Sequence, residues 1–290
     1  MPIIEVEDAA DPRLASYALV ADPSGLQRSG RFIAEGRLVV ERLLALPDYE
    51  IESLLLSASA LRALAAQIDA NARRFPVYVC PAPLFERLTG HEFHRGCLGL
   101  VRRPAPLDPE LLISHARLLV VLEAVANADN VGGVFRNAAA FGADAVLLDP
   151  ACSDPLYRKA IRTSMGASLS VPFVRIGAEG PPKCESTPGV PKRTLPELLS
   201  VLRERGFEVL ALTPQPPSCD LDTWAASASP SARRALLLGA EGAGLSADVL
   251  ARATLRLRIA MRPGIDSLNL SVACGIALQR LHALESLRGS

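Results

Sequence analysis

The polar residues best placed to do chemistry fall in three segments, each of which follows an apolar run of strand length. In the first, "LLVVLEAV" (118–125) precedes "NADNVGGVFRNAAAFGADAVLL" (127–148), a helical, alanine-rich stretch with Asn130 at its start and Arg136 inside it. Loops at the carboxyl ends of strands are where α/β proteins keep their sites. Asn130 could instead cap the helix, and Arg136 could form a surface ion pair. The segment by itself leaves both interpretations open.

The second segment is "LLLGAEGAGLS" (236–246), in which a buried strand runs into a glycine-rich turn. Gly239, Gly242 and Gly244 could admit a ligand against bare main chain, with Glu241 among them. Their G-x-x-G-x-G spacing is neither the dinucleotide-binding G-x-G-x-x-G nor a Walker loop. Taken alone, the spacing favours a tight structural turn.

The third segment is "RIAMRPGIDSLNLSVACGIALQRL" (258–281), in which a strand passes through Pro263-Gly264 into an apolar helix. Ser267 and Asn269 stand where the helix begins. Unpaired main-chain N–H groups point outward there and can meet a ligand, although Ser and Asn also serve as caps. Small residues on one side of the helix indicate close packing against a neighbouring element.

The elements that must position these segments alternate regularly along the second half of the chain. We expect strands at 118–125, 144–149, 169–175, 207–213, 235–239 and 254–260. We expect helices at 131–141, 154–163, 195–205, 246–252 and 267–287. This alternation predicts an α/β fold with a largely parallel sheet and helices on both of its faces. The stretch 177–194 interrupts the alternation and is expected to be a surface loop.

The chain before the proline-rich stretch "RRPAPLDPEL" (102–111) indicates a separate, small α/β domain. Its strand-like runs are 51–58, 75–80 and 97–101, and its helical runs are 36–46, 60–75 and 83–88. Residues 1–30 are expected to be loosely ordered apart from a helix near 12–21. The predicted organisation is an N-terminal extension (1–30), a small domain (31–104) and a larger α/β domain (105–290).

The order of the three segments is more specific than any one of them. Asn-x₅-Arg after a strand, then G-x-E-G-x-G-L-S, then I-x-M…S-L-N-x-S-V-A resembles the three motifs of the SpoU/TrmH family of RNA 2′-O-ribose methyltransferases, in the SPOUT superfamily. The segment 152–173 resembles the connection that the family places between its first two motifs. The first half, with "FIAEGRLVVERLL" (32–44) and "LTGHEFHRGCLGLV" (88–101), resembles the small RNA substrate-binding domain, related to ribosomal protein L30e, that many members carry. The resemblance covers about residues 30–287.

The resemblance implies a SPOUT fold whose C-terminal part is tied in a trefoil knot that holds S-adenosyl-L-methionine (AdoMet) against main-chain atoms. Strand and helix patterns alone would not suggest such a knot, because knots are nearly absent from proteins. The resemblance also implies a homodimer whose site draws on both subunits. By residue matching, the cofactor-binding residues are Leu212, Thr213, Gly239, Glu241, Gly244, Ile259, Met261, Ser267 and Leu268.

Two positions depart from the usual motifs of the family. Ala240 stands where the second motif often has the asparagine of GNEG, so any role of that amide is lost here. Ala260 stands where the third motif often has the proline of Ile-Pro-Met. The second change weakens the rigidity of a turn more than the chemistry.

The implied reaction is transfer of a methyl group to a ribose 2′-hydroxyl of rRNA or tRNA, which needs no metal. A guanidinium has a pKa above about 12, so Arg136 is a poor proton acceptor. We expect Arg136 to hold the ribose-phosphate and stabilise the developing alkoxide while water or a phosphate oxygen takes the proton. Asn130 would orient Arg136 or the ribose, and Glu241 would fix Arg136 or a neighbouring loop. Ser267 and Asn269 would complete the catalytic pocket.

The net charge of zero, from 31 basic and 31 acidic residues, is unusual for a protein that binds RNA phosphates. RNA is recognised largely by shape, by splayed loops and by the 2′-hydroxyl, so one basic groove could suffice. The candidate RNA-binding residues for that groove are Arg95, Arg102, Arg103, Arg158, Lys159 and Arg162.

Composition and spacing exclude several other classes. No segment reaches 18 apolar residues without a charge, and the acidic N-terminus does not resemble a signal peptide, so a cytoplasmic protein is expected. Scattered cysteines without a CxxC pair argue against a disulfide framework or a zinc ribbon, and "HEFH" (91–94) lacks further metal ligands. A nicotinamide-dependent oxidoreductase would need G-x-G-x-x-G where the chain has "ANADNVGG" (126–133). A non-catalytic RNA-binding module is the remaining alternative, and the presence of every motif residue favours the enzyme.

Overall fold

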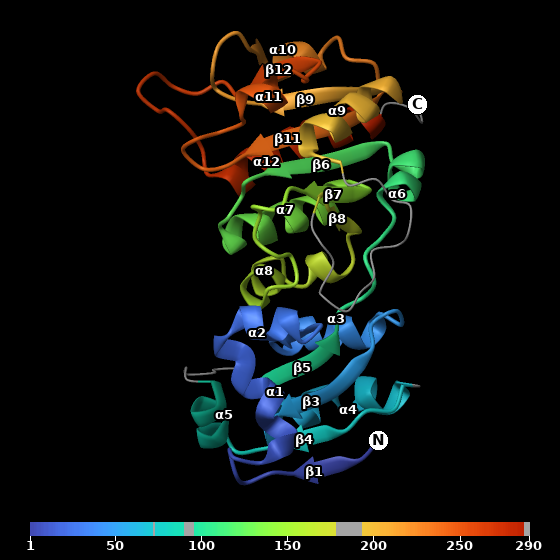
Figure 1. The fold of residues 1–290 in the computed structure, drawn as a ribbon, viewed down its shortest axis with the longest axis vertical. Coiled ribbons are helices and arrows are strands. Elements are labelled where there is room, and N and C mark those ends of the chain that lie inside the picture. Colours follow the sequence, from blue (N-terminus) through green and yellow to red (C-terminus); the bar gives the residue numbers. More distant parts are fainter. Residues whose placement is uncertain (72, 90–95, 178–192, 287–290) are drawn as a thin grey trace. The chain divides into compact units, whose positions relative to one another are not determined.

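The computed structural model describes residues 1–71, 73–89, 96–177 and 193–286 (Figure 1). Among these residues the chain forms two compact units. The first contains Met1–Ala105 together with Pro155–Leu169, and the second contains the rest. The segment Pro155–Leu169 therefore clusters with the first unit, although the sequence suggested no such excursion. The predicted domain boundaries themselves stay a prediction.

The first unit is built on a five-stranded mixed sheet in the order β1-β4-β3-β5-β2. Its strands are β1 (Ile3–Glu5), β2 (Arg31–Glu35), β3 (Ile51–Leu56), β4 (Val77–Val79) and β5 (Cys97–Arg102). Neighbours β1, β4 and β3 are parallel, whereas β5 is antiparallel to both β3 and β2. Its helices are α1 (Ala15–Ala18), α2 (Pro23–Arg28), α3 (Arg37–Ala45), α4 (Ala58–Ala70), α5 (Ala82–Thr89) and α8 (Arg158–Thr163), with 3₁₀ turns η1 (Pro12–Leu14), η2 (Leu19–Ala21) and η3 (Ala167–Leu169).

Residues 12–21 are helical, as expected, in the form of η1, α1 and η2. The expectation that the rest of residues 1–30 is loosely ordered is wrong, since β1 and α2 form there. Strand β1 pairs with β4, and Leu14 and Tyr17 are completely buried. The Tyr17 hydroxyl lies 2.7 Å from the Ser53 Oγ, inside a cluster of buried apolar residues from this segment and the sheet. The apolar residues of the segment follow neither a strand nor a helix period, because short elements succeed one another here.

Replacing Tyr17 with Phe should destabilise the first unit, because it leaves the buried Ser53 hydroxyl without its partner. We expect a loss of about 1–2 kcal/mol in the free energy of unfolding, measured by urea denaturation. The Tyr49→Phe variant is the control, since the Tyr49 hydroxyl forms no hydrogen bond within the described residues. Equal stability of the two variants would contradict the role given to Tyr17.

The second unit is built on a seven-stranded sheet in the order β10-β12-β9-β11-β6-β7-β8. Every pair of neighbours in it is parallel. Its strands are β6 (Leu118–Glu123), β7 (Ala145–Leu148), β8 (Phe173–Arg175), β9 (Phe207–Leu212), β10 (Cys219–Asp220), β11 (Arg233–Gly239) and β12 (Leu255–Arg258). Its helices are α6 (Pro109–His115), α7 (Ala128–Phe141), α9 (Leu195–Glu204), α10 (Leu221–Ala225), α11 (Ala247–Leu250) and α12 (Leu270–Ser286). The predicted α/β fold with a largely parallel sheet is confirmed.

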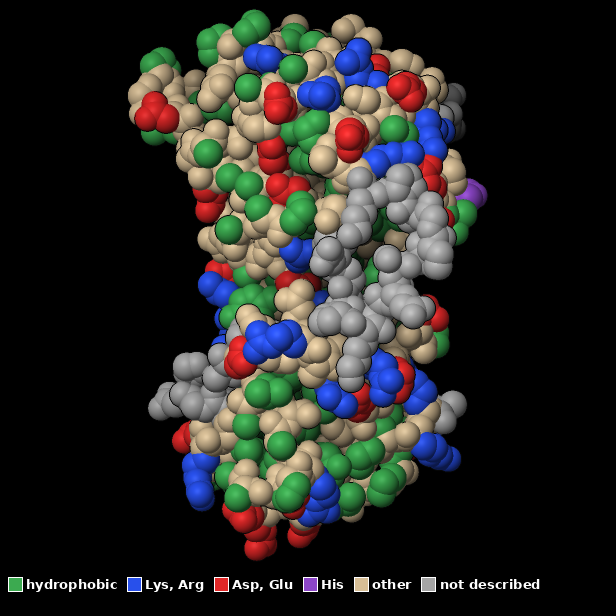
Figure 2. Space-filling view, viewed as in Figure 1, with side chains coloured by type: hydrophobic (Ala, Val, Ile, Leu, Met, Phe, Trp, Pro, Cys, Tyr) green, Lys and Arg blue, Asp and Glu red, His purple; other side chains and the backbone are tan. Residues whose placement is uncertain are grey.

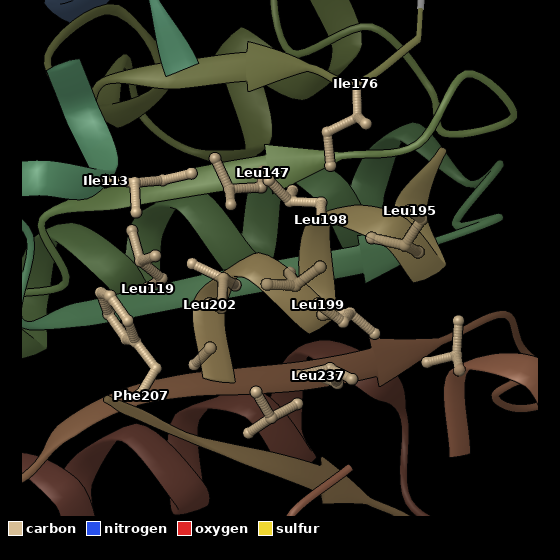
Figure 3. Packing of buried hydrophobic residues seen from close by; sticks show 14 of the residues in the cluster. Ile113, Leu119, Leu147, Ile176, Leu195, Leu198, Leu199, Leu202, Phe207 and Leu237 are labelled. Atoms are coloured by element: carbon tan, nitrogen blue, oxygen red, sulfur yellow. The ribbon is translucent and has the colours of Figure 1, made fainter. Parts of the chain in front are cut away.

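The central strands are buried on both faces. Residues 118–122 of β6 and 234–238 of β11 are all buried, although successive side chains of a strand point to opposite faces. On one face, Leu198, Leu199 and Leu202 of α9 pack among Leu119 and Leu237 of these two strands (Figure 3). This double coverage explains why residues 118–122 and 235–238 appear in the sequence as unbroken apolar runs.

Two elements of the second unit lie where no helix was expected. Helix α6 falls within and just after the stretch 102–111, which the prolines indicated to be a linker. Pro109 occupies the first turn of α6, and Asp108 caps it by accepting the N–H of Glu110 at 2.8 Å. Proline is tolerated at that position because its missing N–H would be unpaired anyway. Helix α10 follows Asp220 in a stretch that was left unassigned.

Candidate functional site

The three motif segments begin at the carboxyl ends of β6, β11 and β12. These strands and β9 are neighbours in the order β12-β9-β11-β6, and all are parallel. Their carboxyl ends therefore meet at one edge of the sheet. Segments that stand far apart in the sequence are brought together there, at the place where ligands bind in open parallel sheets.

Asn130 is not the cap of its helix. Helix α7 begins at Ala128, and Asn127 caps it by accepting the N–H of Asp129 at 2.9 Å. Asn130 is the third residue of the helix, and only 3% of its surface is exposed. The capping interpretation of Asn130 is thus wrong, because an asparagine three residues earlier takes that role.

The buried amide of Asn130 links the three motif segments. Its Nδ2 donates a hydrogen bond to the carboxylate of Glu241, in the glycine-rich loop after β11. Its Oδ1 accepts a hydrogen bond from Nδ2 of Asn269 at 3.0 Å. One side chain of the first motif is therefore bonded to the second motif on one side and to the third on the other.

Asn269 both caps its helix and joins this network. Its Oδ1 accepts the N–H of Ser271 at 3.0 Å and the Ser271 hydroxyl at 2.7 Å, at the first turn of α12. The capping interpretation is therefore correct for Asn269, and its remaining amide group is left for Asn130. Ser267 is exposed and forms no hydrogen bond within the described residues.

Arg136 is exposed on α7 and forms no ion pair or hydrogen bond with any described residue. The surface ion pair considered for it is thus not formed in the described part of the chain. Glu241 is bonded to Asn130 rather than to Arg136. The guanidinium remains available to a bound molecule.

The glycine-rich loop after β11 closes tightly on itself. A Cβ on Gly239 would lie 2.2 Å from the main-chain carbon of Gly244, so a side chain is impossible there. The Gly244 N–H donates to the Ala240 oxygen at 2.9 Å, and Gly242 and Gly244 have positive φ angles of 84° and 70°. For Gly239 the structural interpretation is correct, because the missing side chain makes room for the loop itself.

The remaining cofactor candidates lie on the same edge. Leu212 ends β9, and Thr213 follows it with its N–H bonded to the Leu257 oxygen at 2.8 Å. Ile259, Met261, Ser267 and Leu268 belong to the connection 259–269 between β12 and α12. This connection, orange-red in Figure 1, loops out from the second unit.

The connection 259–269 offers main-chain groups to a ligand. Residues 262–269 are all exposed, and the main chain of Met261 and Leu268 forms no hydrogen bond within the described residues. A turn over Arg262–Ile265, with Pro263 second and Gly264 third at φ 88°, fixes its outer end. A cofactor gripped by main-chain atoms fits this donor set.

Close packing of α7 against α12 holds the network in place. A Cβ on Gly133 would lie 2.5 Å from the Cβ of Ser271, and the Asn137 amide donates to the Ser271 oxygen at 2.6 Å. A Cβ on Gly275 would likewise lie 3.2 Å from Nδ2 of Asn137. The small residues of the third motif thus serve close helix packing, as expected.

The candidate RNA-binding arginines are mostly held by carboxylates. Arg102 pairs with Glu50 at 3.2 Å, and both Arg158 and Arg162 reach Glu35, at 3.0 and 3.4 Å. Arg103 donates to the main-chain oxygen of Arg31. Lys159 lies half-buried on α8 beside these arginines, and Arg95 lies outside the described residues, as does the "HEFH" segment.

The predicted basic groove stays a prediction. On the face drawn in Figure 2, basic and acidic side chains of the described residues are interspersed over each unit.

Within the residues that the structure describes, no helix is long and apolar enough to cross a membrane.

Comparison with known proteins agrees with the three motifs. Residues 117–180 and 183–279 match the SpoU rRNA Methylase family. An uncharacterized tRNA/rRNA methyltransferase of Mycobacterium bovis is 36% identical over 281 residues, which cover 96% of this chain and 91% of the relative. The chain belongs to the SpoU rRNA methylase family. It is an RNA methyltransferase, and the methyl donor of the family is AdoMet, as the motifs predicted.

Two further comparisons extend over nearly the whole chain. RlmP of Bacillus subtilis, a 23S rRNA (guanosine(2553)-2′-O)-methyltransferase, is 24% identical over 279 residues, which cover 96% of this chain and 98% of RlmP. An AdoMet-bound rRNA methyltransferase from Sinorhizobium meliloti has the same fold. Its TM-score is 0.74 at 22% identity, and the match covers 97% of this chain and 98% of that one.

Sequence reasoning missed Glu123 and Asn137. Glu123 ends β6, and its carboxylate accepts the N–H of Ser246 at 2.8 Å. A charged residue at the end of an apolar, strand-like run was the signal that could have found it. Asn137 could not be found in this way, because its partner Ser271 lies 134 residues away in the sequence.

Replacing Asn130 with Asp should make stability depend on pH. The new carboxyl is buried next to Glu241, and both burial and the neighbouring charge raise its pKa in the folded state. A raised pKa stabilises the fold below the unfolded-state value of about 4, and this contribution is lost as pH rises. We expect a deficit of about 2–4 kcal/mol at pH 8 that shrinks toward pH 5, measured by urea denaturation.

The Asn130→Ala variant is the matched control. It removes both hydrogen bonds without adding a charge, so its deficit should be nearly the same at the two pH values. A deficit of the Asp variant that does not change with pH would contradict both the burial of position 130 and its closeness to Glu241.

Proposed function

We propose that this RNA methyltransferase transfers the methyl group of AdoMet to a ribose 2′-hydroxyl of rRNA or tRNA. The observation that carries the proposal is the buried amide of Asn130, bonded to Glu241 and to Asn269. It joins the three family motifs at one edge of the parallel sheet. The 2′-O specificity in the name of the relative RlmP supports the choice of acceptor.

The residues proposed to hold AdoMet are the main chain of the connection 259–269, the glycine-rich loop and the end of β9. When bound, AdoMet supplies a methyl group on a sulfonium, which is already a strong electrophile. Thr213 and Leu212 would close the pocket from β9, and Gly242 and Gly244 leave open space, since a Cβ on either would meet no atom within 4 Å. The protein then has to position the 2′-hydroxyl and stabilise its negative charge.

Arg136 is the residue proposed to meet the ribose. Its guanidinium stays protonated at neutral pH and cannot serve as the base. Being exposed and without a partner among the described residues, it can hold the ribose-phosphate by two hydrogen bonds and stabilise the developing alkoxide. The proton passes to water or to a substrate phosphate oxygen. Asn130, Glu241, Ser267 and Asn269 shape the pocket around it.

A non-catalytic RNA-binding module is the second candidate function. It would tolerate loss of the hydrogen bonds that join the motifs. Here both bonds of Asn130 are formed and no motif residue with a role in the network is replaced. The intact network favours the enzyme.

The order of the elements supports the trefoil knot that is typical of SPOUT proteins. Strand β12 lies two strands beyond β11 in the sheet, yet α12, which follows it, packs against α7 next to β6. The connection 259–269 must therefore pass back along the edge where the glycine-rich loop stands. The first unit, a small mixed sheet with helices, fits the proposed L30e-like RNA-binding domain.

Exposed apolar side chains support a homodimer. Val272 and Ile276, one turn apart on α12, are 51% and 37% exposed, and Ile265 and Leu268 of the preceding connection are also exposed. Such a patch beside a site usually marks an interface between proteins. A second copy seated here would let both subunits contribute to the site.

The proposed location of this enzyme, where its RNA is made, is the cytoplasm.

Replacing Arg136 with Ala should reduce methyl transfer about 10²–10³-fold, because one preorganised donor to the alkoxide is lost. The rate of methyl transfer by Arg136→Lys should lie between those of the wild type and Arg136→Ala, since an ammonium keeps the charge but cannot form the paired hydrogen bonds of a guanidinium. The measurement is transfer of labelled methyl from AdoMet to size-fractionated bacterial RNA, followed by digestion to nucleosides. The fraction that carries the label tells rRNA from tRNA.

The control for this experiment is Arg203→Ala, an exposed arginine of α9 near the amino ends of the strands, which should retain full activity. Label on a base would show that the acceptor is wrong. AdoMet binding by the wild type without any labelled RNA fraction would favour the binding module.

Replacing Val272 with Glu should shift the protein toward monomers, because it buries a charge in the proposed interface. Light scattering at micromolar concentration measures the change. Leu111→Glu is the control, since Leu111 is 62% exposed on α6, outside the proposed interface. A wild type that is monomeric at the same concentration would rule the dimer out.

A further inference from the structure

Glu123 stands at the junction of the first two motifs. It is the last residue of β6 and is directly opposite Gly239, the last residue of β11. Glu123 therefore lies beside the first residue of the glycine-rich loop 239–246. Oε2 accepts the N–H of Ser246 at 2.8 Å, at the far end of the same loop. Glu123 therefore ties the two ends of the loop to one strand.

The tip of the loop has few restraints from outside. Glu241, Gly242 and Ala243 at its tip are exposed, and its glycines lose more conformational freedom on ordering than other residues. Within the described residues, the side chains from elsewhere in the chain that hydrogen-bond to the loop are Asn130, through Glu241, and Glu123, through Ser246. Both come from β6 or the helix that follows it. Leu245, near the end of the loop, packs into the core.

The chain leaves β6 in a fixed direction. Ala124, directly after Glu123, has a positive φ of 54°, a conformation that alanine rarely adopts. The next residue is tied on both sides, since the Val125 N–H donates to the Cys152 sulfur and its oxygen accepts the Ser153 N–H at 2.9 Å. Glu123 is thus attached to a rigid support, as a residue that positions a loop must be.

We propose that Glu123 is a positioning residue that presets the glycine-rich loop for the cofactor and so raises the affinity for AdoMet. The inference rests on the proposed function, because it places AdoMet against this loop. A loop ordered before binding loses less entropy when the ligand arrives, and a hydrogen bond to a carboxylate is stronger than one between neutral groups. Glu123 itself does not need to touch AdoMet.

The test compares three variants by calorimetric titration with AdoMet. E123A should bind about tenfold more weakly, because the charge-assisted bond is lost. E123Q should stay within about threefold of the wild type, because its amide oxygen can accept the same N–H. R203A is the control and should bind as the wild type does, because Arg203 is exposed on α9 near the amino ends of the strands. In steady-state assays E123A should raise KM for AdoMet and leave kcat nearly unchanged.

Hydrogen–deuterium exchange gives a readout that does not depend on activity. Amides of residues 239–246 should exchange faster in E123A than in the wild type or E123Q, with no change in the strands. Wild-type affinity in E123A would overturn the proposal, and so would E123Q binding as weakly as E123A. If E123A does not fold, E123D takes its place, since its shorter side chain cannot reach Ser246, and wild-type affinity there would likewise overturn it.

A failure of the proposed function looks different. In that case the wild type itself would bind no AdoMet, whatever residue stands at position 123. The exchange experiment then still decides whether Glu123 orders the loop, and unchanged exchange in E123A overturns the inference.

Discussion

The parallel direction of all seven strands in the second unit is the constraint on which the site depends. A parallel strand can be followed by another only after the chain has crossed back over a face of the sheet. Each crossing uses a helix or a long connection, so residues that meet at the carboxyl edge are far apart in the sequence. Asn130 and Glu241 are separated by 111 residues, and Asn130 and Asn269 by 139. The fold alone makes them neighbours.

At the carboxyl edge of the sheet, the stability of the fold and the arrangement of the proposed site depend on the same side chain, that of Asn130. The Asn130 amide is buried, and a buried polar group without a partner costs about 1–3 kcal/mol. Glu241 and Asn269 supply its partners. The free energy lost if the Asn130 amide were unpaired therefore keeps the second and third motifs in position beside the first. A second carboxylate, that of Glu123, restrains the other end of the glycine-rich loop. The site is thus organised before any ligand binds.

The sequence predicted the elements of the second unit well because buried parallel strands are continuous apolar runs. Strand β6, expected at 118–125, spans Leu118–Glu123, and α9, expected at 195–205, spans Leu195–Glu204. The errors came from choices that local sequence cannot decide. Asn127 and Asn130 are both suitable caps by residue type, and only the buried partners of Asn130 exclude it from that role. The motifs still identified the family, because their order does not depend on which asparagine caps the helix.

The ion pairs of the candidate RNA-binding arginines could not be predicted for a related reason. Arg158 and Glu35 lie 123 residues apart, so nothing in the neighbourhood of "YRKAIRT" (157–163) indicated that its arginines would face a carboxylate. Arg102 is paired with Glu50, and Arg158 and Arg162 share the single carboxylate of Glu35. Arg136, by contrast, is exposed on the helix that also carries Asn130. We propose that Arg136 holds the ribose, and that in a chain with a net charge of zero RNA shape and the 2′-hydroxyl supply the rest of recognition.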